Sequence, residues 1–207
     1  ELMEAIVGLR PRLSGEVHVR GKLLTAGHPQ DAIDNGLAYM TKDRKQRGLL
    51  LESRMTPNLT LQSLDRHVRS FYLNPASEAE AMTRATRRFD IRVRDNRIVA
   101  GRMSGGNQQK LLLAKVMETE PSIIIIDEPT RGIDVGTKQQ IYHFISALAR
   151  EGKSIIVVSS EMPEIIGLCS RVAVMREGAI SGVLEGDEIN EQEIMRFAAG
   201  LKRREAA

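Results

Sequence analysis

Two adjacent acidic residues, Asp127 and Glu128, follow an unbroken run of four isoleucines at 123–126. Four β-branched residues without polar alternation predict a strand buried on both faces, as in a parallel α/β sheet. Ligands of such sheets bind just outside the carboxyl ends of the strands, so a carboxylate pair there could hold a Mg²⁺-phosphate group and an attacking water. The alternative is a core strand that simply ends at a solvated acidic turn. These residues alone leave both interpretations open.

A second candidate site begins at Ser104, which is followed by Gly105 and Gly106. Ser104 is a suitable N-cap for the helix predicted by the apolar run after Lys110, and the glycines allow the backbone to approach a ligand closely. Amide groups at a helix N-terminus, with a hydroxyl beside them, form an anion site. Taken alone, Ser-Gly-Gly is more often a loop that only turns the chain into a helix.

Together the two stretches carry a specific resemblance. Met-Ser-Gly-Gly-Asn-Gln-Gln-Lys at 103–110 and Ile-Ile-Ile-Ile-Asp-Glu-Pro-Thr at 123–130 resemble the signature motif and the Walker B motif of ATP-binding-cassette (ABC) ATPases. Thr-Arg-Gly-Ile-Asp-Val-Gly at 130–136 and Ser-Ser-Glu-Met-Pro-Glu at 159–164 are similar to one branch, the ATPase subunits of ribose-, galactose- and xylose-type sugar importers. Those subunits carry two cassettes in one chain. The resemblance covers nearly the whole sequence and points to the second, C-terminal cassette.

The resemblance implies an α/β fold of the ABC-type P-loop NTPase class: a RecA-like, mostly parallel sheet with helices on both faces, plus a helical subdomain. Residues 1–207 are expected to form one partial ATP-binding domain, with its core at 1–52 and 103–184, the helical subdomain at 53–102, and a C-terminal helix and tail at 185–207. The sequence contains no G-x-x-x-x-G-K-[ST] loop, because Gly152-Lys153-Ser154 lacks the first glycine and precedes a strand. Residues 1–9 read as the body of a helix, and we therefore expect an N-terminal truncation just after Walker A.

The family also implies a role for each candidate residue. Asp127 would hold Mg²⁺ through a water, and Glu128 would orient or deprotonate the attacking water. Ser104, Gly105, Gly106 and Gln108 would bind ATP, with the Ser-Gly-Gly loop acting in trans on a nucleotide held by another cassette. The remaining positions are Asp134 in the D-loop, Ser160 where the family usually has its switch histidine, and Thr41 or Lys42 where the Q-loop usually has its glutamine. These departures predict that the cassette's own site is slow or silent.

The amino-acid composition argues against several classes of function. The net charge is only +3, aromatic residues make up 3%, and there is no Trp, so a base-stacking nucleic-acid platform is poorly supported. The single cysteine, Cys169, excludes an internal disulfide and suits a reducing cytosol. No apolar segment approaches the roughly 20 residues that span a bilayer, so a membrane role must come through a partner.

By resemblance, the cofactors are ATP and Mg²⁺. The partners are the first cassette of the parent chain or a dimer partner, a transmembrane permease and, indirectly, a periplasmic sugar-binding protein. The expected location is the cytoplasmic side of the inner membrane, as a peripheral subunit. Two alternatives remain: an isolated non-catalytic fragment, and an ABC ATPase that acts on nucleic acid.

Seven arginines lie in the second half of the predicted helical subdomain, at 84, 87, 88, 92, 94, 97 and 102. The simpler interpretation is the solvated basic face of a small helical unit. The other is contact with a permease loop near anionic lipid head groups. These arginines are also the only support for nucleic-acid binding, which would make the affinity strongly salt-dependent.

Local patterns predict the remaining elements. A hairpin strand is expected at 15–22, and the charged run at 41–48 reads as a solvated loop in the Q-loop position. The other expected elements are helices at 29–35, 77–89, 137–150, 162–169 and 190–199, strands at 37–40, 171–175 and 180–184, a buried strand at 154–158, and a frayed basic tail at Lys202, Arg203 and Arg204.

Overall fold

A computed structural model describes residues 1–202 of the chain. The chain divides into two compact units, one spanning Glu1–Val158 and the other beginning at Ser159. Each unit has its own apolar core.

The sheet of the first unit consists of three parallel strands, β3 (Leu37–Met40), β6 (Ile123–Asp127) and β7 (Ser154–Val158), in the order β3-β6-β7. The central strand contains the isoleucine run, and three of its four isoleucines have no exposed surface. The prediction of a buried strand in a parallel sheet is therefore confirmed. The register pairs Asp127 with Val158, so the acidic pair lies at the carboxyl edge of the sheet.

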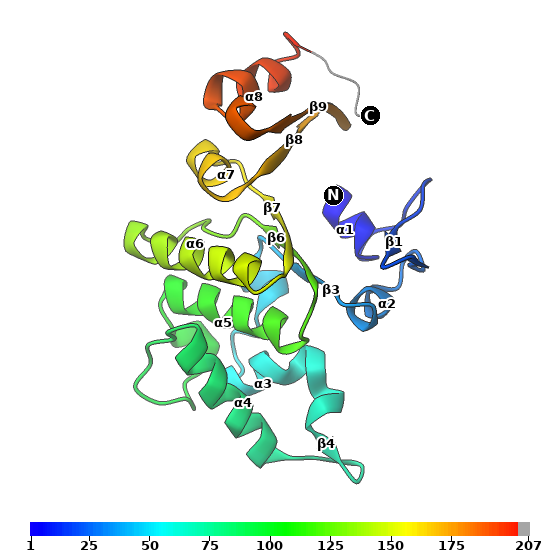
Figure 1. Ribbon diagram of the computed structural model, residues 1–207. Helices are drawn as coiled ribbons and strands as arrows, with labels where there is room; N and C mark the ends of the chain where they lie inside the picture. The colour runs from blue at the N-terminus through cyan, green and yellow to red at the C-terminus, as the bar shows by residue number, and fades with distance from the viewer. Residues whose placement is uncertain (203–207) are drawn as a thin grey trace. The chain divides into compact units, whose positions relative to one another are not determined.

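Helices and short strands cover both faces of this sheet (Figure 1). On one side lie α5 (Gly105–Glu118) and α6 (Val135–Arg150), which pack against each other. On the other side lie α1 (Leu2–Ile6), β1 (His18–Val19), β2 (Lys22–Leu23) and α2 (Pro29–Asp34). Ile125 packs with these N-terminal elements, in a core that includes Val7 and Leu37. Because side chains alternate along a strand, the neighbours of Ile125 face the side of α5.

The prediction that the strand at 154–158 is buried is wrong. β7 forms at the expected position, but none of its five residues is fully buried, and Ile156 is 42% exposed. Within residues 1–202, β7 pairs with β6 alone, so one of its edges has no neighbouring strand. An apolar run of this kind predicts a strand correctly, but burial depends on how many neighbours the strand acquires.

Between β3 and β6 along the chain, the first unit contains a mostly helical region. It comprises α3 (Met55–Thr60), the 3-10 helix η2 (Leu61–His67), the hairpin of β4 (Val68–Arg69) and β5 (Tyr72–Leu73), α4 (Pro75–Arg88) and the short η3 (Ala100–Arg102). α4 begins two residues before the predicted start, because the Asn74 side chain accepts hydrogen bonds from the amides of Ala76 and Ser77. The hairpin was not predicted. The subdomain boundaries expected from the sequence stay a prediction.

The second unit consists of α7 (Met162–Leu168), the antiparallel pair β8 (Arg171–Arg176) and β9 (Ala179–Glu185), η4 (Gly186–Glu188) and α8 (Glu191–Ala198). The last predicted helix forms as α8, and Asn190 caps it by accepting from the Glu193 amide at 3.0 Å. Phe197 fills the core directly over Gly182, where an added Cβ would lie 2.3 Å from the ring. Of the predicted basic tail, Lys202 donates to Glu193 at 2.7 Å, whereas Arg203 and Arg204 lie outside the described residues.

Candidate functional site

The acidic pair lies where β6 leaves the sheet. The Tyr39 hydroxyl, on the neighbouring strand β3, donates a hydrogen bond of 2.9 Å to Oδ2 of Asp127. Burial, and then this bond to a carboxylate, raise the pKa of Tyr39 above its ordinary value. Tyr39 therefore stays a protonated donor that holds one oxygen of Asp127 and leaves the other for a ligand.

Glu128 turns the chain out of the strand. Its φ is +51°, a left-handed conformation that costs a non-glycine residue about 1–2 kcal/mol. The Glu128 amide donates to the Val158 carbonyl at 2.7 Å, and its carbonyl accepts from the Arg131 amide at 3.2 Å. The two bonds fix this turn at the sheet edge, and a strained, well-anchored residue is typical of a functional position.

The signature stretch forms the N-terminus of α5, as predicted. Ser104 is the exposed N-cap, and its hydroxyl oxygen accepts from the Asn107 amide at 3.3 Å. The amides of Gly105 and Gly106 occupy the first turn, where a helix has no internal acceptor for them, and no acceptor elsewhere in residues 1–202 takes them. An exposed hydroxyl beside two unused amides is an arrangement that can bind an anion.

Gly106 and Asp134 are brought together through Thr137 on α6. Asp134 caps α6 and accepts from both the amide and the hydroxyl of Thr137, at 3.0 Å and 2.8 Å. These bonds, the amide bond first, lower the pKa of Asp134. An added Cβ on Gly106 would lie 2.7 Å from both Oγ1 and Cγ2 of Thr137. The signature and D-loop positions therefore form one contiguous surface.

Arg44 connects the charged run to the same surface. It opens the π-helical turn η1 (Arg44–Gly48), which Asp43 caps by accepting from the Gln46 amide at 3.0 Å. The Arg44 side chain is half-buried, and its Nε and Nη1 donate to the side-chain oxygens of Gln108 and Gln109, each at 3.1 Å. The expectation of a wholly solvated loop is therefore wrong for Arg44.

This arginine also contributes charge to the candidate anion site. An added Cβ on Gly105 would lie 3.3 Å from Nη2 of Arg44, so the guanidinium lies directly behind the signature loop. Gln109 continues the chain of hydrogen bonds by donating to the Pro129 carbonyl, just after Walker B, at 2.6 Å. Sequence reasoning did not single out Arg44, because a run of charged residues gives no sign of which one turns inward.

Two other predicted site residues are placed differently. Gln108 is buried, and both ends of its amide are used inside the chain: its oxygen accepts from Arg44, and its nitrogen donates to the Ala100 carbonyl at 3.0 Å. In this structure it supports the signature loop from behind. Ser160 is exposed and belongs to the second unit, so its distance from Asp127 is not defined by the fold of the first unit.

The acidic pair at the carboxyl edge of the sheet fits a site for Mg²⁺ that binds together with a phosphate ligand. Within residues 1–202 no group of three His, Cys, Asp or Glu side chains could hold a metal ion by itself. Mg²⁺ usually keeps several waters and binds through one or two carboxylates together with substrate phosphates. The oxygen of Asp127 that Tyr39 does not occupy fits this mode. A Mg²⁺ that arrives with a nucleotide is therefore compatible with these residues.

Comparison with known proteins identifies the family of this chain. The family model described as "ABC transporter" matches residues 1–131, and the chain belongs to that family. Within residues 1–202 no helix is long and apolar enough to cross a membrane.

The similar curated proteins are ribose import ATP-binding proteins. RbsA 2 of Burkholderia pseudomallei (strain 1710b) is 44% identical over 210 residues, covering all of this chain and 41% of that protein. RbsA 2 of Escherichia coli O157:H7 is 41% identical over 97% of this chain and 40% of that protein. RbsA of Geobacillus kaustophilus is 39% identical over 98% of this chain and 41% of that protein. The chain spans about two fifths of the length of the curated relatives it matches.

Solved structures show the fold. A nucleotide-free ATP-binding cassette from an ABC transporter superimposes with a TM-score of 0.77 at 17% identity, covering 94% of this chain and 78% of that one. The dimeric post-hydrolysis state of the cassette MJ0796, bound to ADP and Pi, has a TM-score of 0.74 at 17% identity and covers 89% of this chain and 78% of that one. The predicted ABC-type α/β fold is confirmed.

Proposed function

We propose that this chain is part of the ATP-binding, ATP-hydrolysing motor subunit of a carbohydrate importer of the ribose type, with ATP and Mg²⁺ as cofactors. The family match and the similarity to ribose import proteins along the whole chain support the class. The observation that carries the mechanism is the exposed Ser104 hydroxyl beside the unused amides of Gly105 and Gly106.

In this mechanism the signature loop contacts a nucleotide that another cassette has bound. The Gly105 and Gly106 amides and the Ser104 hydroxyl donate to the outer phosphate, where negative charge is stabilised by the helix N-terminus. Arg44, held behind Gly105 by Gln108, adds a positive charge to the same place. These contacts fix the N-terminus of α5, so the hydrogen-bond donors are in position before the nucleotide arrives. Donors that are fixed in this way stabilise the charge that develops during phosphoryl transfer.

The ATP site of this cassette itself includes the acidic pair at the carboxyl edge of the sheet. Asp127, oriented by Tyr39, would help to hold a Mg²⁺ that enters with the nucleotide, and the ion would supply charge stabilisation for the phosphates; Glu128 would orient or deprotonate the attacking water. Ser160 stands where the family usually has a histidine, and the Q-loop position has no glutamine. A serine hydroxyl is a weaker base than an imidazole at neutral pH, so we propose that this site is slow or silent and that the chain mainly completes its partner's site.

The partners follow from this arrangement: a first cassette in the same parent chain or a dimer partner, a transmembrane permease, and indirectly a periplasmic sugar-binding protein. A dimeric cassette among the structures of the same fold supports the pairing. The subunit would be peripheral, on the cytoplasmic side of the inner membrane. The names of the relatives favour import over the nucleic-acid alternative.

The test compares two variants of the full-length protein that carries this sequence, assembled with its permease. Ser104→Arg places a long cation in the signature loop and should remove most of the ATPase activity, more than tenfold, because the outer phosphate loses its donors. Glu128→Gln should reduce the activity far less, because the site it serves contributes little turnover. Steady-state release of phosphate measures both.

Asn190→Arg is the matched control, because Asn190 is an exposed N-cap like Ser104 but belongs to α8. It should cost about 1 kcal/mol of stability from the lost cap and leave ATPase activity near wild type. Equal losses from Ser104→Arg and Glu128→Gln would refute the asymmetry between the two sites. No loss from Ser104→Arg would refute the trans contact.

A further inference from the structure

An open surface pocket of about 530 Å³ lies next to the signature loop in the first unit. It lies between the segment that joins α4 to α5 and the first turn of α5. Its size is in the range of small-molecule sites, about 300–1,000 Å³. The residues that line it are Arg92, Val93, Arg94, Asp95, Arg97, Ile98, Arg102, Met103, Ser104 and Asn107.

The lining of this pocket, which we call the arginine pocket, carries an excess of positive charge. It contains four guanidinium groups and one carboxylate. Within residues 1–202, only Arg92 among these four has a carboxylate within 4.0 Å, that of Asp90 at 2.9 Å. Arginine cannot release its proton in a protein, so the repulsion between these side chains is not relieved by titration. An anionic ligand would relieve it, because opposite charge in a concave site is strongly favoured.

The walls of the arginine pocket are held from several sides. Asn107 exchanges two hydrogen bonds with the backbone of Arg92, at 3.0 Å and 2.8 Å. The buried Lys110 ammonium donates to the Asp90 carbonyl at 2.7 Å. Further along the segment, the Ile98 carbonyl accepts from the Met55 amide at 3.2 Å. Because both ends of the segment are tied to helices, the pocket exists before any ligand binds.

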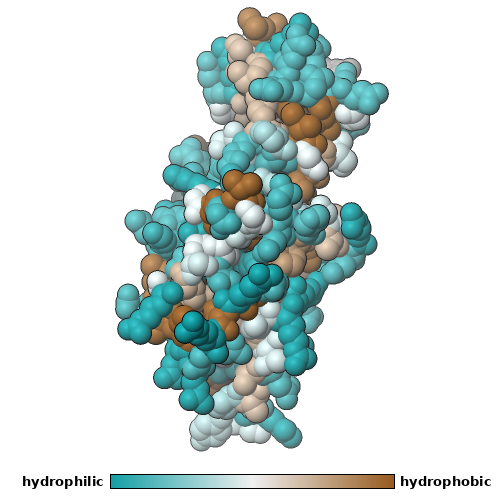
Figure 2. Space-filling model, turned by 90° about the vertical axis from the view of Figure 1, so that its left-hand side faces the viewer, coloured by the Kyte–Doolittle hydropathy of each residue, from teal (hydrophilic) through white to brown (hydrophobic). Residues whose placement is uncertain are grey.

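The pocket also has an apolar part, formed by Val93, Ile98 and the buried Met103. Figure 2 views the side from which this segment projects in Figure 1, and it shows strongly hydrophilic residues around a smaller apolar patch. A bare inorganic ion would leave the apolar part unused. An anion that carries a less polar organic body would use both parts.

We propose that the arginine pocket binds a phosphate monoester, with Arg94, Arg97 and Arg102 holding the phosphate and the apolar part contacting the organic body. Guanidinium groups match phosphate oxygens with paired, charge-assisted hydrogen bonds, which explains why arginines rather than lysines suit this site. Ser104 also lines the pocket, but the three arginines proposed to hold the phosphate take no part in the contact proposed between the Ser104 hydroxyl and ATP, and binding here does not depend on catalysis. Free phosphate shares the same chemistry, so the test includes it.

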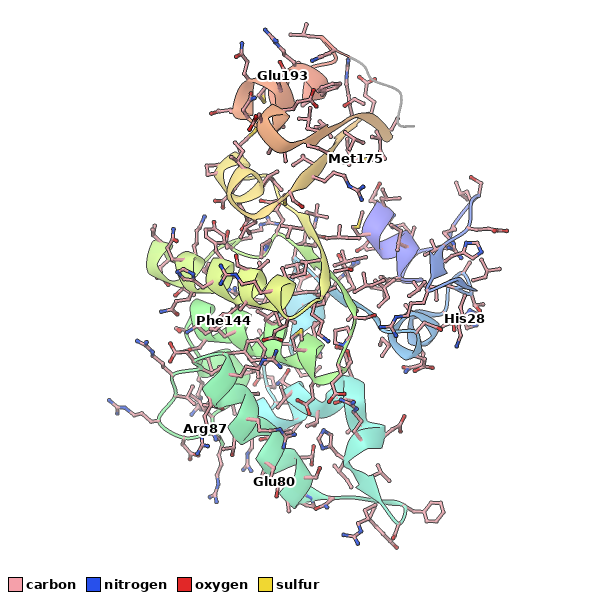
Figure 3. The ribbon with its side chains drawn as sticks, in the orientation of Figure 1. His28, Glu80, Arg87, Phe144, Met175 and Glu193 are labelled. Atoms are coloured by element: carbon pink, nitrogen blue, oxygen red, sulfur yellow. The ribbon has the colours of Figure 1, made fainter. Side chains whose placement is uncertain are left out.

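The experiment is calorimetric titration of the full-length protein at low salt with ribose 5-phosphate, inorganic phosphate and uncharged ribose. The test variant is the double substitution Arg94→Gln/Arg97→Gln. The control is Arg84→Gln/Arg87→Gln, which removes the same charge from α4 outside the pocket; Arg87 is labelled in Figure 3. All four side chains are exposed, so both variants should fold, and circular dichroism verifies it.

We expect ribose 5-phosphate to bind the wild type and the control within about threefold of each other. The test variant should bind it at least about tenfold more weakly, and a tenfold change corresponds to about 1.4 kcal/mol of binding free energy. Weaker binding of inorganic phosphate supports the monoester, and equal binding assigns the same pocket to free phosphate. The proposal is overturned if neither anion binds the wild type at millimolar concentration. It is also overturned if the test variant binds like the wild type or if the control is weakened as much as the test variant.

Discussion

The contact between Gly106 and Thr137 predicts a specific cost for the smallest possible substitution, Gly106→Ala. The added methyl group would lie 2.7 Å from Oγ1 and Cγ2 of Thr137, and 3.1 Å from its Cβ. These distances are shorter than carbon and oxygen atoms tolerate, so α5 and α6 must move apart or Thr137 must leave its hydrogen bond to Asp134. The signature and D-loop positions would then separate.

The expected change in the free energy of unfolding is the sum of two opposing effects. Overpacking of this kind costs about 1–3 kcal/mol. Replacing glycine by alanine in a helix contributes about 0.5–1 kcal/mol in the opposite direction, because the unfolded chain loses freedom. We therefore expect a net loss of up to about 2.5 kcal/mol in the free energy of unfolding for Gly106→Ala.

Gly136→Ala is the matched control, because Gly136 occupies the same second position of α6 that Gly106 occupies in α5. Its added Cβ would meet only Oδ1 of Asp134, at 3.4 Å, which is an ordinary contact. This variant should be neutral or more stable by up to about 1 kcal/mol. Denaturant unfolding of the two variants, followed by circular dichroism, measures the difference directly.

A double-mutant cycle isolates the contact itself. Thr137→Ala removes Oγ1 and Cγ2 and costs about 0.5–1.5 kcal/mol, because the hydrogen bond to Asp134 is removed. In that background Gly106→Ala should cost about 1–2 kcal/mol less than in the wild type. If Gly106→Ala costs the same in both backgrounds, or is as harmless as Gly136→Ala, the argument from this contact is wrong.

Two further predictions concern the hydrogen bonds of the site. Arg44→Met should destabilise the protein by about 2–4 kcal/mol, because the buried oxygens of Gln108 and Gln109 each lose their donor. Denaturant unfolding measures this, and a loss below about 0.5 kcal/mol would contradict it. Tyr39→Phe removes the donor to Asp127 and should cost about 0.5–1.5 kcal/mol at neutral pH. Because the pKa of Tyr39 is raised by folding, its contribution is fully present below the unfolded pKa of about 10 and is lost as pH rises through the folded value. The difference between the wild-type and Tyr39→Phe tyrosinate titrations should therefore show one tyrosine that ionises late, and ionisation of Tyr39 near pH 10 would contradict the burial argument.

Local patterns in the sequence determined most of the elements and the candidate site. Four β-branched residues specified the central strand, and the periodic run after Ser104 specified α5. The cap at Ser104 could be identified because such a residue bonds to an amide two or three residues ahead, whereas Asp134 was predicted only as a D-loop position and proved to cap α6. The motif resemblance then located the acidic pair and the signature loop on these elements.

The tertiary structure alone decided which side chains meet across the fold. Arg44 turns inward to the α5 glutamines while Lys45 and Arg47 remain exposed. Lys110 is buried against the Asp90 carbonyl. The edge-to-face pair of Phe89 and Phe144, with ring centroids 5.7 Å apart, likewise joins the end of α4 to α6; Phe144 is labelled in Figure 3. Short-range patterns report backbone conformation and periodicity, whereas these contacts depend on how separate elements pack. For the same reason, the sequence showed a run of arginines, and only the folded chain gathered four of them around one pocket.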